Sequence, residues 1–364
     1  MIRTNLQRGL LLGFSHFFVD FACTALLATL TTHLSALEVA ACALLYNGLA
    51  FAFQLPIGAL ADKLRLHRDL AALGCLLTAL GALFSQPLIL CCLIGIGNAC
   101  FHVGGGREAL KQGRGTASFV GCFVAPGAIG IFLGPRLWDV SWLTKGILPG
   151  CLLFLCICLF LRRAEGRNAE QLTCGRCRLS SAGTVIAIGC MFLTVLLRSY
   201  MGTVLQYTIL SGFWPALLFT ISIFAGKFLG GALADRFGAL PFNAFAQLLA
   251  VALFTASVRF QWLAFPAIFL FNTTMATTAT QLYRCMPQFP GTMFGLTTFA
   301  LYLGVVPRLL GLGNPFFTWW GLGALSLVSA LLLLLGLYCI QGGVRHAAAA
   351  SPVAGSFTGA DTAP

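Results

Sequence analysis

The chain has 364 residues, of which 59% are hydrophobic and only 9% are charged, and its mean hydropathy is +0.91. A soluble globular protein carries roughly 25% charged residues. The charge is therefore too sparse to cover soluble domains, and the composition predicts a polytopic membrane protein. The formal net charge of +12 comes from 22 Lys and Arg against 10 Asp and Glu. The basic residues gather in short segments between apolar runs, which is typical of cytoplasmic loops rather than of a nucleic-acid-binding surface.

Apolar runs of about 20 residues, separated by Gly, Pro or charged residues, predict twelve transmembrane helices. Their predicted limits are 10–31, 39–61, 70–86, 87–105, 116–134, 146–161, 182–208, 212–233, 241–257, 262–281, 291–311 and 317–340. The first run is too long and too polar for a cleaved signal peptide, so we expect a retained helix, and a cleaved segment is the alternative.

The predicted fold class is an all-α polytopic membrane protein with twelve transmembrane helices in two six-helix bundles. The predicted divisions are an N-terminal bundle at 1–161, a cytoplasmic central loop at 162–181, a C-terminal bundle at 182–340 and a disordered cytoplasmic tail at 341–364. With the N-terminus inside, sixteen of the 22 basic residues lie on the cytoplasmic side, three in outer loops and three inside helices. This asymmetry predicts that both termini are cytoplasmic, and a bacterial inner membrane is the expected location.

Two short segments look like copies of one another. The sequence Gly-Ala-Leu-Ala-Asp, followed by a cation, occurs after the second predicted helix and again after the eighth, 173 residues further on. The matching residues are Gly58, Asp62 and Lys63 in the first copy and Gly231, Asp235 and Arg236 in the second. A repeat at matching positions indicates duplication of a six-helix unit. An Asp beside a cation at a helix end offers an ion pair that can form in one conformation and break in another. A tight turn with a solvated pair is the alternative.

Each segment resembles the signature between the second and third helices of the major facilitator superfamily, G-x-L-a-D-r-x-G-r-[kr]. The first copy keeps Leu60 and has Arg65 where the family has its later Gly. The second keeps Leu233 and Gly238 but lacks the final basic residues. The resemblance covers the whole twelve-helix layout, and it implies that the two segments gate the exchange between outward-facing and inward-facing states.

The fifth predicted helix resembles the antiporter motif g-x-x-x-G-P-x-x-G-G of the same superfamily. Gly121, Pro126 and Gly130 match, while Ala125 and Ile129 replace glycines. Small residues at this spacing let helices approach closely, and Pro bends a helix. In the family the motif accompanies proton-linked exporters. A Gly- and Pro-rich helix without that function is the alternative.

The first and fourth predicted helices resemble the fosmidomycin-resistance branch of exporters, in which the first helix carries S-H-x-x-x-D and the fourth ends F-H-P-E-x-x-R. The matching residues are Ser15, His16 and Asp20 in the first helix and Phe101, His102 and Arg107 in the fourth. Val103 and Gly104 stand in place of the Pro-Glu pair. The resemblance implies an exporter, and the missing Glu leaves its substrate open.

His16 and Asp20 also stand out without any resemblance. Ionisable residues at membrane depth cost at least about 2.5–3.5 kcal/mol, so they normally face a cavity or a partner. The two residues are four positions apart and therefore share one face of the first helix. Asp20 is the only acidic residue well inside a predicted helix. It is the best candidate for a proton-binding carboxylate, with His16 relaying or tuning the proton. A static pair that only fixes helix packing is the alternative.

Three basic residues also fall inside predicted helices. Arg198 and Arg308 leave a positive excess, and we expect them to bind an anionic substrate through bidentate guanidinium contacts. Pairing of Arg198 with Asp20, and contact of Arg308 with lipid headgroups, are the alternatives. Lys227 is expected to extend towards the cytoplasm without a role in transport. Neutral polar side chains that are expected to line the pathway, or to hydrogen-bond between helices instead, are Tyr46, Asn47, Gln206, Tyr207 and Asn272.

Two further patterns carry no prediction of chemistry. Cys174 and Cys177 have CxxC spacing without a second ligand pair, so no metal site is predicted. The glycines before Arg107 lack the Lys-Ser/Thr of a phosphate-binding loop. We therefore expect no cofactor, no ATP site and no enzyme activity.

The predicted function is secondary active transport of a small anionic or amphiphilic compound by alternating access, as proton-coupled efflux. An importer or uniporter of a nutrient or organic anion on the same fold is the alternative. A receptor or membrane enzyme with a transporter-like fold is a more distant one. The expected partners are the small-molecule substrate, protons and the lipid bilayer, with no nucleic acid, and the chain is expected to be a monomer.

Overall fold

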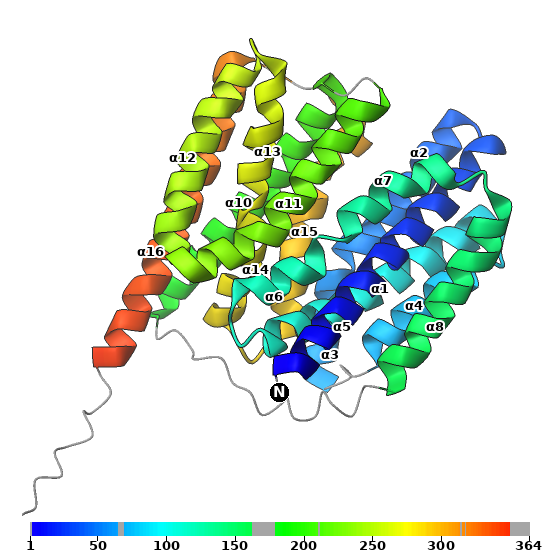
Figure 1. Cartoon of the computed structure of the whole chain (residues 1–364), viewed down its shortest axis with the longest axis horizontal. Coiled ribbons are helices and arrows are strands. Elements are labelled where there is room, and N and C mark those ends of the chain that lie inside the picture. Colours follow the sequence, from blue (N-terminus) through cyan, green and yellow to red (C-terminus); the bar gives the residue numbers. More distant parts are fainter. Residues whose placement is uncertain are drawn as a thin grey trace, which may run out of the picture.

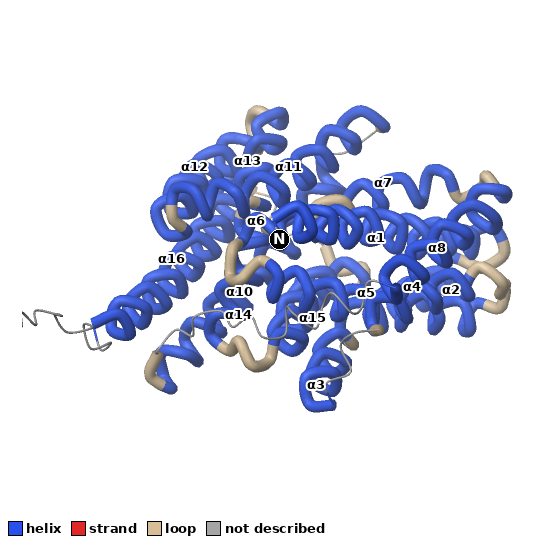
Figure 2. Tube along the Cα trace, turned by 60° about the horizontal axis from the view of Figure 1, so that its bottom comes forward, coloured by secondary structure: helices blue, strands red, loops and turns tan. Residues whose placement is uncertain are grey.

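The computed structural model describes residues 2–64, 69–161, 179–209, 212–313, 315–316 and 318–349. All regular structure in these residues is helical, as Figure 2 shows. The predicted all-α fold class is confirmed for this part of the chain.

The helices form two groups in space (Figure 1). The first comprises α1 (Ile2–Thr29), α2 (Ala36–Asn47), α3 (Gln54–Leu64), α4 (Leu70–Gly81), α5 (Pro87–Gln112), α6 (Ala117–Val124), α7 (Gly127–Leu137) and α8 (Leu148–Leu161). The second comprises α10 (Ser181–Ile209), α11 (Phe213–Phe237), α12 (Ala239–Ser257), α13 (Ala264–Asn272), α14 (Thr274–Cys285), α15 (Pro290–Leu309) and α16 (Trp319–Ala349). The groups contact each other mainly where α3, α5 and α6 meet α11, α14 and α15.

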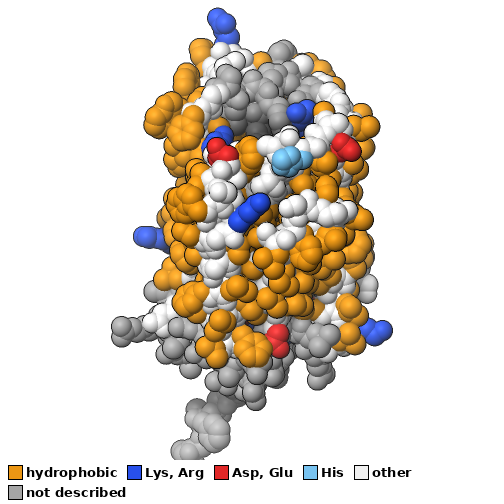
Figure 3. All heavy atoms as spheres, turned by 90° about the vertical axis from the view of Figure 1, so that its right-hand side faces the viewer, with side chains coloured by type: hydrophobic (Ala, Val, Ile, Leu, Met, Phe, Trp, Pro, Cys, Tyr) orange, Lys and Arg blue, Asp and Glu red, His pale blue; other side chains and the backbone are white. Residues whose placement is uncertain are grey.

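Ten helical segments of the described chain are long and apolar enough to cross a membrane. They account for ten of the twelve predicted helices. The third prediction corresponds to α4, which has only 12 residues, and the tenth is divided at Thr273 between α13 and α14. A band of hydrophobic side chains crosses the face drawn in Figure 3, and most acidic and basic side chains visible there lie above or below it. This distribution suits a chain embedded in lipid.

Three spanning segments are irregular along their length. Pro126, which has no N–H to donate, separates α6 from α7. A π-helical turn at Gly48–Ala52 joins α2 to α3, and Thr273 interrupts the tenth segment. Irregular backbone is tolerated at membrane depth where protein covers it. The backbone of Thr273 is covered in this way by Gly230 of α11, where any side chain would collide with it.

The fourth helix is longer than predicted. α5 continues to Gln112, beyond the predicted end at 105, and its additional turns contact α1. Glu108 forms an ion pair with Arg8 of α1 and accepts a hydrogen bond from Gln112. Glu108 is therefore a further acidic residue of a long apolar helix, but it lies near the helix end, whereas Asp20 lies well inside α1.

Two predicted divisions of the chain can be compared with the structure only in part. Of the predicted central loop at 162–181, residues 162–178 lie outside the described residues. The predicted disordered tail begins at 341, whereas α16 continues to Ala349. The alanines that end the helix favour helical backbone. Residues 350–364 lie outside the described part of the chain.

Glycines let helices of the first group reach backbone contact. Gly74 of α4 and Gly97 of α5 lie against each other's helices, and a Cβ at either position would collide with the facing backbone. Gly130 and Gly134 make the same kind of contact between α7 and α1. Helix α1 therefore packs closely against α7 as well as α5, and these contacts position the polar side chains on its inner face.

Candidate functional site

A buried polar cluster lies inside the first group of helices. His16 and Asp20 are one turn apart on α1, and His102 reaches them from α5. His16 Nε2 lies 3.1 Å from Asp20 Oδ2 and 2.8 Å from His102 Nε2, while His102 Nε2 lies 3.7 Å from Asp20 Oδ1. All three side chains are buried. The structure thus brings His16 and Asp20 of the first predicted helix into contact with His102 of the fourth.

The hydrogen bonds of the two imidazoles determine where their protons lie. His16 Nδ1 is 2.7 Å from the carbonyl oxygen of Phe123, and His102 Nδ1 is 2.9 Å from that of Asn98. A carbonyl oxygen only accepts, so both Nδ1 atoms carry a proton. Two neutral rings would then point bare Nε2 lone pairs at each other over 2.8 Å, which is repulsive. A second proton on one Nε2 would turn this contact into a hydrogen bond, and the pair would then be a single cation beside the Asp20 carboxylate.

Neighbouring helices hold the Asp20 carboxylate in place. Asn98 Nδ2 donates to Asp20 Oδ1 over 3.0 Å. From the other side, a Cβ at Gly127 of α7 would collide with Asp20 Oδ2 and His16 Nε2. Gly130, which belongs to the antiporter-like pattern, lies against the backbone of α1 one turn further along. These glycines let α7 close over the cluster.

Tyr46 lies next to this cluster. Its side chain is buried and lies near Cys23, which follows Asp20 by three positions on α1. The Cys23 sulfur is also 3.8 Å from Asn98 Nδ2. Asn98 was not predicted as a site residue from the sequence. Its position four residues before His102 could have indicated it, because this spacing places its amide on the same helix face as an intramembrane histidine.

The same cluster has the composition of a metal site. One ligand atom from each of His16, Asp20 and His102 lies within 4.8 Å of the others. Two imidazole nitrogens on a tetrahedral zinc, each 2.0–2.1 Å from the metal, would stand about 3.3 Å apart. The 2.8 Å between the two Nε2 atoms is a hydrogen-bond distance instead, so a shared proton fits the geometry better than a metal. Cys174 and Cys177 lie outside the described residues.

Arg198 is buried inside the second group. Its guanidinium donates to Oγ1 of Thr274 and to Sδ of Met275, each over 2.7 Å. Both partners are neutral, so they leave the charge uncompensated. The alternative in which Arg198 pairs with Asp20 is not observed, because the ionic contacts of Asp20 are with the two histidines.

Lys227 of α11 does not lie where the sequence suggested. The side chain is partly buried, and its charge interacts with Asp20 and His102 of the first group and with Arg198. Its backbone carbonyl lies against Gly121 of α6. The expected extension towards the cytoplasm was wrong, because this part of α11 packs against the other group.

The other residues expected to bind substrate have separate surroundings. Arg308 is exposed in the last turn of α15, which suits contact with lipid headgroups. Asn47 and Asn272 donate to backbone carbonyls one turn earlier in their own helices. The side chains of Gln206 and Tyr207 lie outside the described residues.

Arg107, from the same pattern as His102, belongs to a different site. It is partly buried, and its charge interacts with Glu108, which is paired with Arg8. The two matching residues of the fourth predicted helix therefore have different surroundings: His102 belongs to the buried polar cluster, and Arg107 to a group of charges near the end of α5.

The two repeated segments join the helical groups at one end of the molecule, which we call the joined end. Asp62, near the end of α3, accepts hydrogen bonds of 3.1 and 2.7 Å from two backbone N–H groups at the start of α15. Asp235, near the end of α11, accepts bonds of 2.9 and 2.8 Å from two at the start of α6. Helix N-termini have unpaired N–H groups and favour a negative charge. Lys63 and Arg236, the expected partners, are exposed, and both carboxylates bond to helix starts of the opposite group.

Glycines bring the same helix pairs, α3 with α15 and α11 with α6, into backbone contact. In each case a Cβ on the glycine would collide with a backbone carbonyl of the other helix. The matched contacts are Gly58 with Gly291 and Gly231 with Ala117, then Gly295 with Gln54 and Gly121 with Lys227. Corresponding residues are 173 or 174 positions apart. The repeat in the sequence therefore extends to the contacts between the groups.

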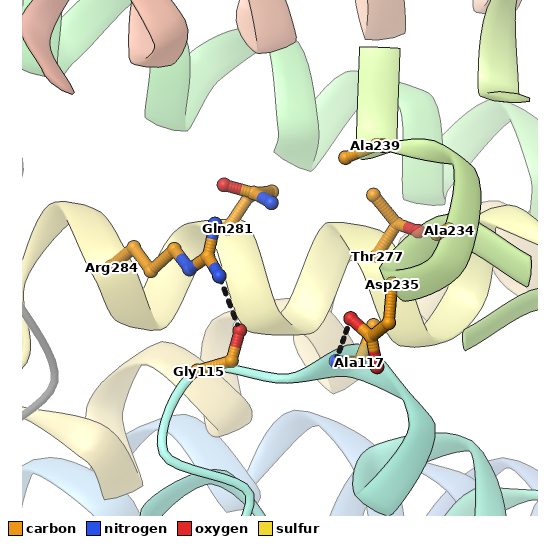
Figure 4. A pocket seen from close by; sticks show the side chains of 9 residues that line it. Gly115, Ala117, Ala234, Asp235, Ala239, Thr277, Gln281 and Arg284 are labelled. Carbon is orange, nitrogen blue, oxygen red and sulfur yellow. Dashed lines mark hydrogen bonds between the residues drawn. The ribbon is translucent and has the colours of Figure 1, made fainter. Parts of the chain in front are cut away.

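A polar pocket of about 190 Å³ lies at the joined end (Figure 4). Asp235 and Ala117 lie on one side of it, and Gln281 and Arg284 of α14 lie on the other. Arg284 Nη2 donates to the carbonyl oxygen of Gly115 over 2.7 Å. This bond also runs between the two helical groups. The joined end is therefore held by hydrogen bonds, which can break and form again.

A second pocket, of about 390 Å³, is apolar and lies where α1, α6 and α7 meet α11. It is lined by Leu10, Gly13, Phe14, Phe17, Cys122, Pro126, Ile129, Phe224 and Phe228. Phe14 and Phe228 are exposed. The pocket therefore opens to the outside of the helices, where it has the shape and polarity to take an apolar group.

No family model matches the chain, and no curated protein matches it. Among solved structures, it is similar to the E. coli fucose:proton symporter FucP, with a TM-score of 0.58 and 14% identity over 93% of this chain and 98% of that chain. It is also similar to a Major Facilitator Superfamily transporter, FucP, in the outward conformation, with a TM-score of 0.57 and the same identity and coverage. Identity at this level establishes the fold alone, and the chain has the fold of the major facilitator superfamily.

Proposed function

We propose that this chain is a secondary active transporter that moves a small anion across the membrane by alternating access, coupled to protons at His16, Asp20 and His102. The observation that carries this proposal is a buried, proton-holding cluster beside a carboxylate and near two cations of the other helical group. Ionisable residues at membrane depth are costly, and they mark pathways for ions or substrates.

The contacts at the joined end support alternating access. Asp62 and Asp235 each hold a helix of the opposite group through hydrogen bonds that can break without covalent change. With the N-terminus in the cytoplasm, this end faces the cytoplasm, and the described state is closed there. Release of both contacts would let the groups rock apart around a central site.

The proton arrangement supports coupling. In the arrangement that we propose, a proton lies between the two imidazoles, whose Nε2 atoms are 2.8 Å apart, and an ionised Asp20 accepts the hydrogen bond of Asn98. Loss of the proton would leave two facing lone pairs and an uncompensated carboxylate, so the cluster would rearrange. Because Gly127 packs directly on it, a rearrangement would displace α7 and the adjoining α6, which contacts the other group through Gly121.

The charges of the second group support an anionic substrate. Arg198 is buried with neutral partners, and Lys227 lies near enough for the two charges to interact. The apolar pocket beside Phe14 and Phe228 also suits the apolar part of an amphiphile with an anionic head.

Export in exchange for protons is the first candidate for the direction. It rests on the resemblance of Gly121, Pro126 and Gly130 to the antiporter motif, and of the His16 and His102 patterns to the fosmidomycin-resistance branch.

Uptake or uniport is the second candidate, and the charges favour proton-coupled uptake. A proton on the histidine pair adds positive charge near Lys227, which strengthens the binding of an anion. Linkage of this sign makes proton and substrate bind together rather than in competition. A fucose:proton symporter has the same fold.

We further propose a multi-pass location in a bacterial inner membrane with both termini in the cytoplasm, from the asymmetry of the basic residues. The chain would act as a monomer and without a cofactor, because one chain supplies both the proton cluster and the cations.

Reconstitution in proteoliposomes tests the proposal. A pH gradient is imposed, and the flux of a panel of carboxylates, phosphonates and sugar acids is followed by solid-supported membrane electrophysiology. Anion accumulation driven by the gradient is the expected result, and its direction separates exchange from co-transport. Transport of a neutral compound that ignores the gradient, with no anion moved, would contradict the proposal.

A further inference from the structure

We propose that Lys227 and Arg198 form one two-cation subsite for a compact anion that carries two negative charges. This inference rests on the proposed function, since it names the class of anion that the transport site takes. It also assigns a binding role to Lys227, which its position in the sequence did not suggest.

The surroundings of Lys227 are unusual for a lysine in a membrane helix. Such side chains normally extend to solvent from a helix end, but Lys227 lies two to three turns before the end of α11 at Phe237. Its ammonium makes no hydrogen bond or ion pair with the described residues. A partly buried ammonium without a counter-ion is unfavourable unless water or a ligand completes its contacts.

The matching residue of the first group indicates that packing does not require this charge. Gln54 of α3 corresponds to Lys227, and the backbone of each lies against a glycine of the opposite group, Gly295 or Gly121. Gln54 is buried and donates to the carbonyl oxygen of Ala50 over 2.6 Å. A neutral side chain therefore suits the same helix crossing, and the cation is present in only one of the two copies.

Lys227 lies near Arg198, because Gly230, on the next turn of α11, packs on Thr273 beside the Arg198 partner Thr274. In the proposed arrangement, Asp20 is offset by the proton on the histidine pair. Arg198 donates only to neutral atoms. Within the described part of α10–α16, the one acidic residue is Asp235, and its carboxylate is bonded to α6 at the joined end. Two positive charges thus remain without a counter-charge, and a dianion would neutralise both.

The two side chains also suit different parts of one anion. A guanidinium offers a planar pair of donors to two oxygens, whereas an ammonium acts as a compact point charge. Arg198 is held rigidly by Thr274 and Met275, while Lys227 has a long flexible stem. Dicarboxylates, sulfate and inorganic phosphate combine two charges with a small volume, so they represent the class.

Binding to the full-length protein in detergent tests this subsite. The probes are succinate, sulfate and inorganic phosphate, compared with acetate and chloride at equal ionic strength, and thermal unfolding is the readout. We expect at least one dianion to raise the unfolding temperature more than the monovalent anions do. Lys227→Gln, which installs the residue of the matching position, should weaken that dianion about tenfold, because a charged hydrogen bond is lost. Lys227→Arg should retain most of the affinity, and the exposed control Lys63→Gln should retain all of it.

Two results would overturn the proposal: no stabilisation by any of the three dianions, or equal dianion affinity of Lys227→Gln and the unmodified protein. If Lys227→Gln does not fold, Lys227→Cys provides a second measurement. Its thiol should react faster with an anionic methanethiosulfonate than with a cationic one, and Arg198→Gln should reduce the difference. Equal rates would also overturn the subsite.

The outcome is separable from that of the proposed function. Dianion binding that depends on Lys227, without proton-driven flux, would contradict transport and leave the subsite standing. Proton-driven anion flux that is unaffected by Lys227→Gln would contradict the subsite alone.

Discussion

In the first helical group, the buried charges satisfy one another through hydrogen bonds, whereas in the second group they have neutral partners or none. The polar atoms of His16, Asp20 and His102 lie within 3.7 Å of one another, while Arg198 donates to a hydroxyl and a thioether. At the joined end, by contrast, the groups make the same contacts twice. The contacts at the joined end are therefore alike in the two copies, while the buried centres of the two groups differ. Two like centres would place equal charges opposite each other, which is repulsive at low dielectric.

The largest expected effect in testing this difference is that of Asp20→Asn. The amide cannot offset the proton on the histidine pair, and breaking a buried ion pair costs about 3–5 kcal/mol. We expect proton-driven flux in proteoliposomes to fall by at least about 100-fold, while exchange of labelled for unlabelled substrate continues. The exposed Asp139→Asn is the control. Wild-type flux in Asp20→Asn would place the coupling residue elsewhere.

The next largest effect is expected for Gly127→Ala, which tests whether the contact of α7 with the cluster of His16, Asp20 and His102 matters for transport. The added Cβ would collide with Asp20 and His16, and overpacking of this kind costs about 1–3 kcal/mol. We expect lower thermal stability and roughly tenfold slower proton-driven flux. Gly189→Ala in α10 is the matched control in the other group, because nothing lies within 4 Å of its added Cβ. Equal behaviour of the two variants would argue against contact between α7 and the cluster.

A moderate effect is expected for Asp62→Ala and Asp235→Ala, which compare the two matched contacts at the joined end. Removing a carboxylate from a helix N-terminus costs about 1–2 kcal/mol, so each variant should shift the population away from the joined state by roughly 5- to 30-fold. Spin labels at the exposed positions Lys63 and Arg236 would report the separation of the groups by double electron–electron resonance. A shift in only one variant would mean that the two copies are not equivalent.

The smallest effect is expected for Arg308→Ala. The side chain is exposed at the end of α15, and exposed substitutions usually change stability by less than about 0.5 kcal/mol. Anion flux should change less than about twofold. A decrease of anion flux by more than tenfold would mean that Arg308 contributes to the anion pathway. Arg198 and Lys227 would then not be the only cations of the second group that matter for the anion.

Most helix positions could be predicted because hydrophobic length is a property of each segment. The misses occurred where a tertiary contact decides the geometry. Helix α5 runs past its predicted end, where Glu108 finds Arg8 as a partner. The tenth segment breaks at Thr273, where the backbone meets Gly230 of another helix. Neither partner is visible in a hydropathy pattern.

The sequence by itself determined the membrane class, the repeated segments and the shared helix face of His16 and Asp20, because each follows from composition or from helical periodicity. Only the tertiary structure decided that His102 meets His16, 86 residues away, and that Asp62 bonds to a helix start 230 residues away. It also decided that Lys227 lies near the other group. Proton positions and charge balance depend on distances between side chains of different helices, and those distances exist only once the helices have packed.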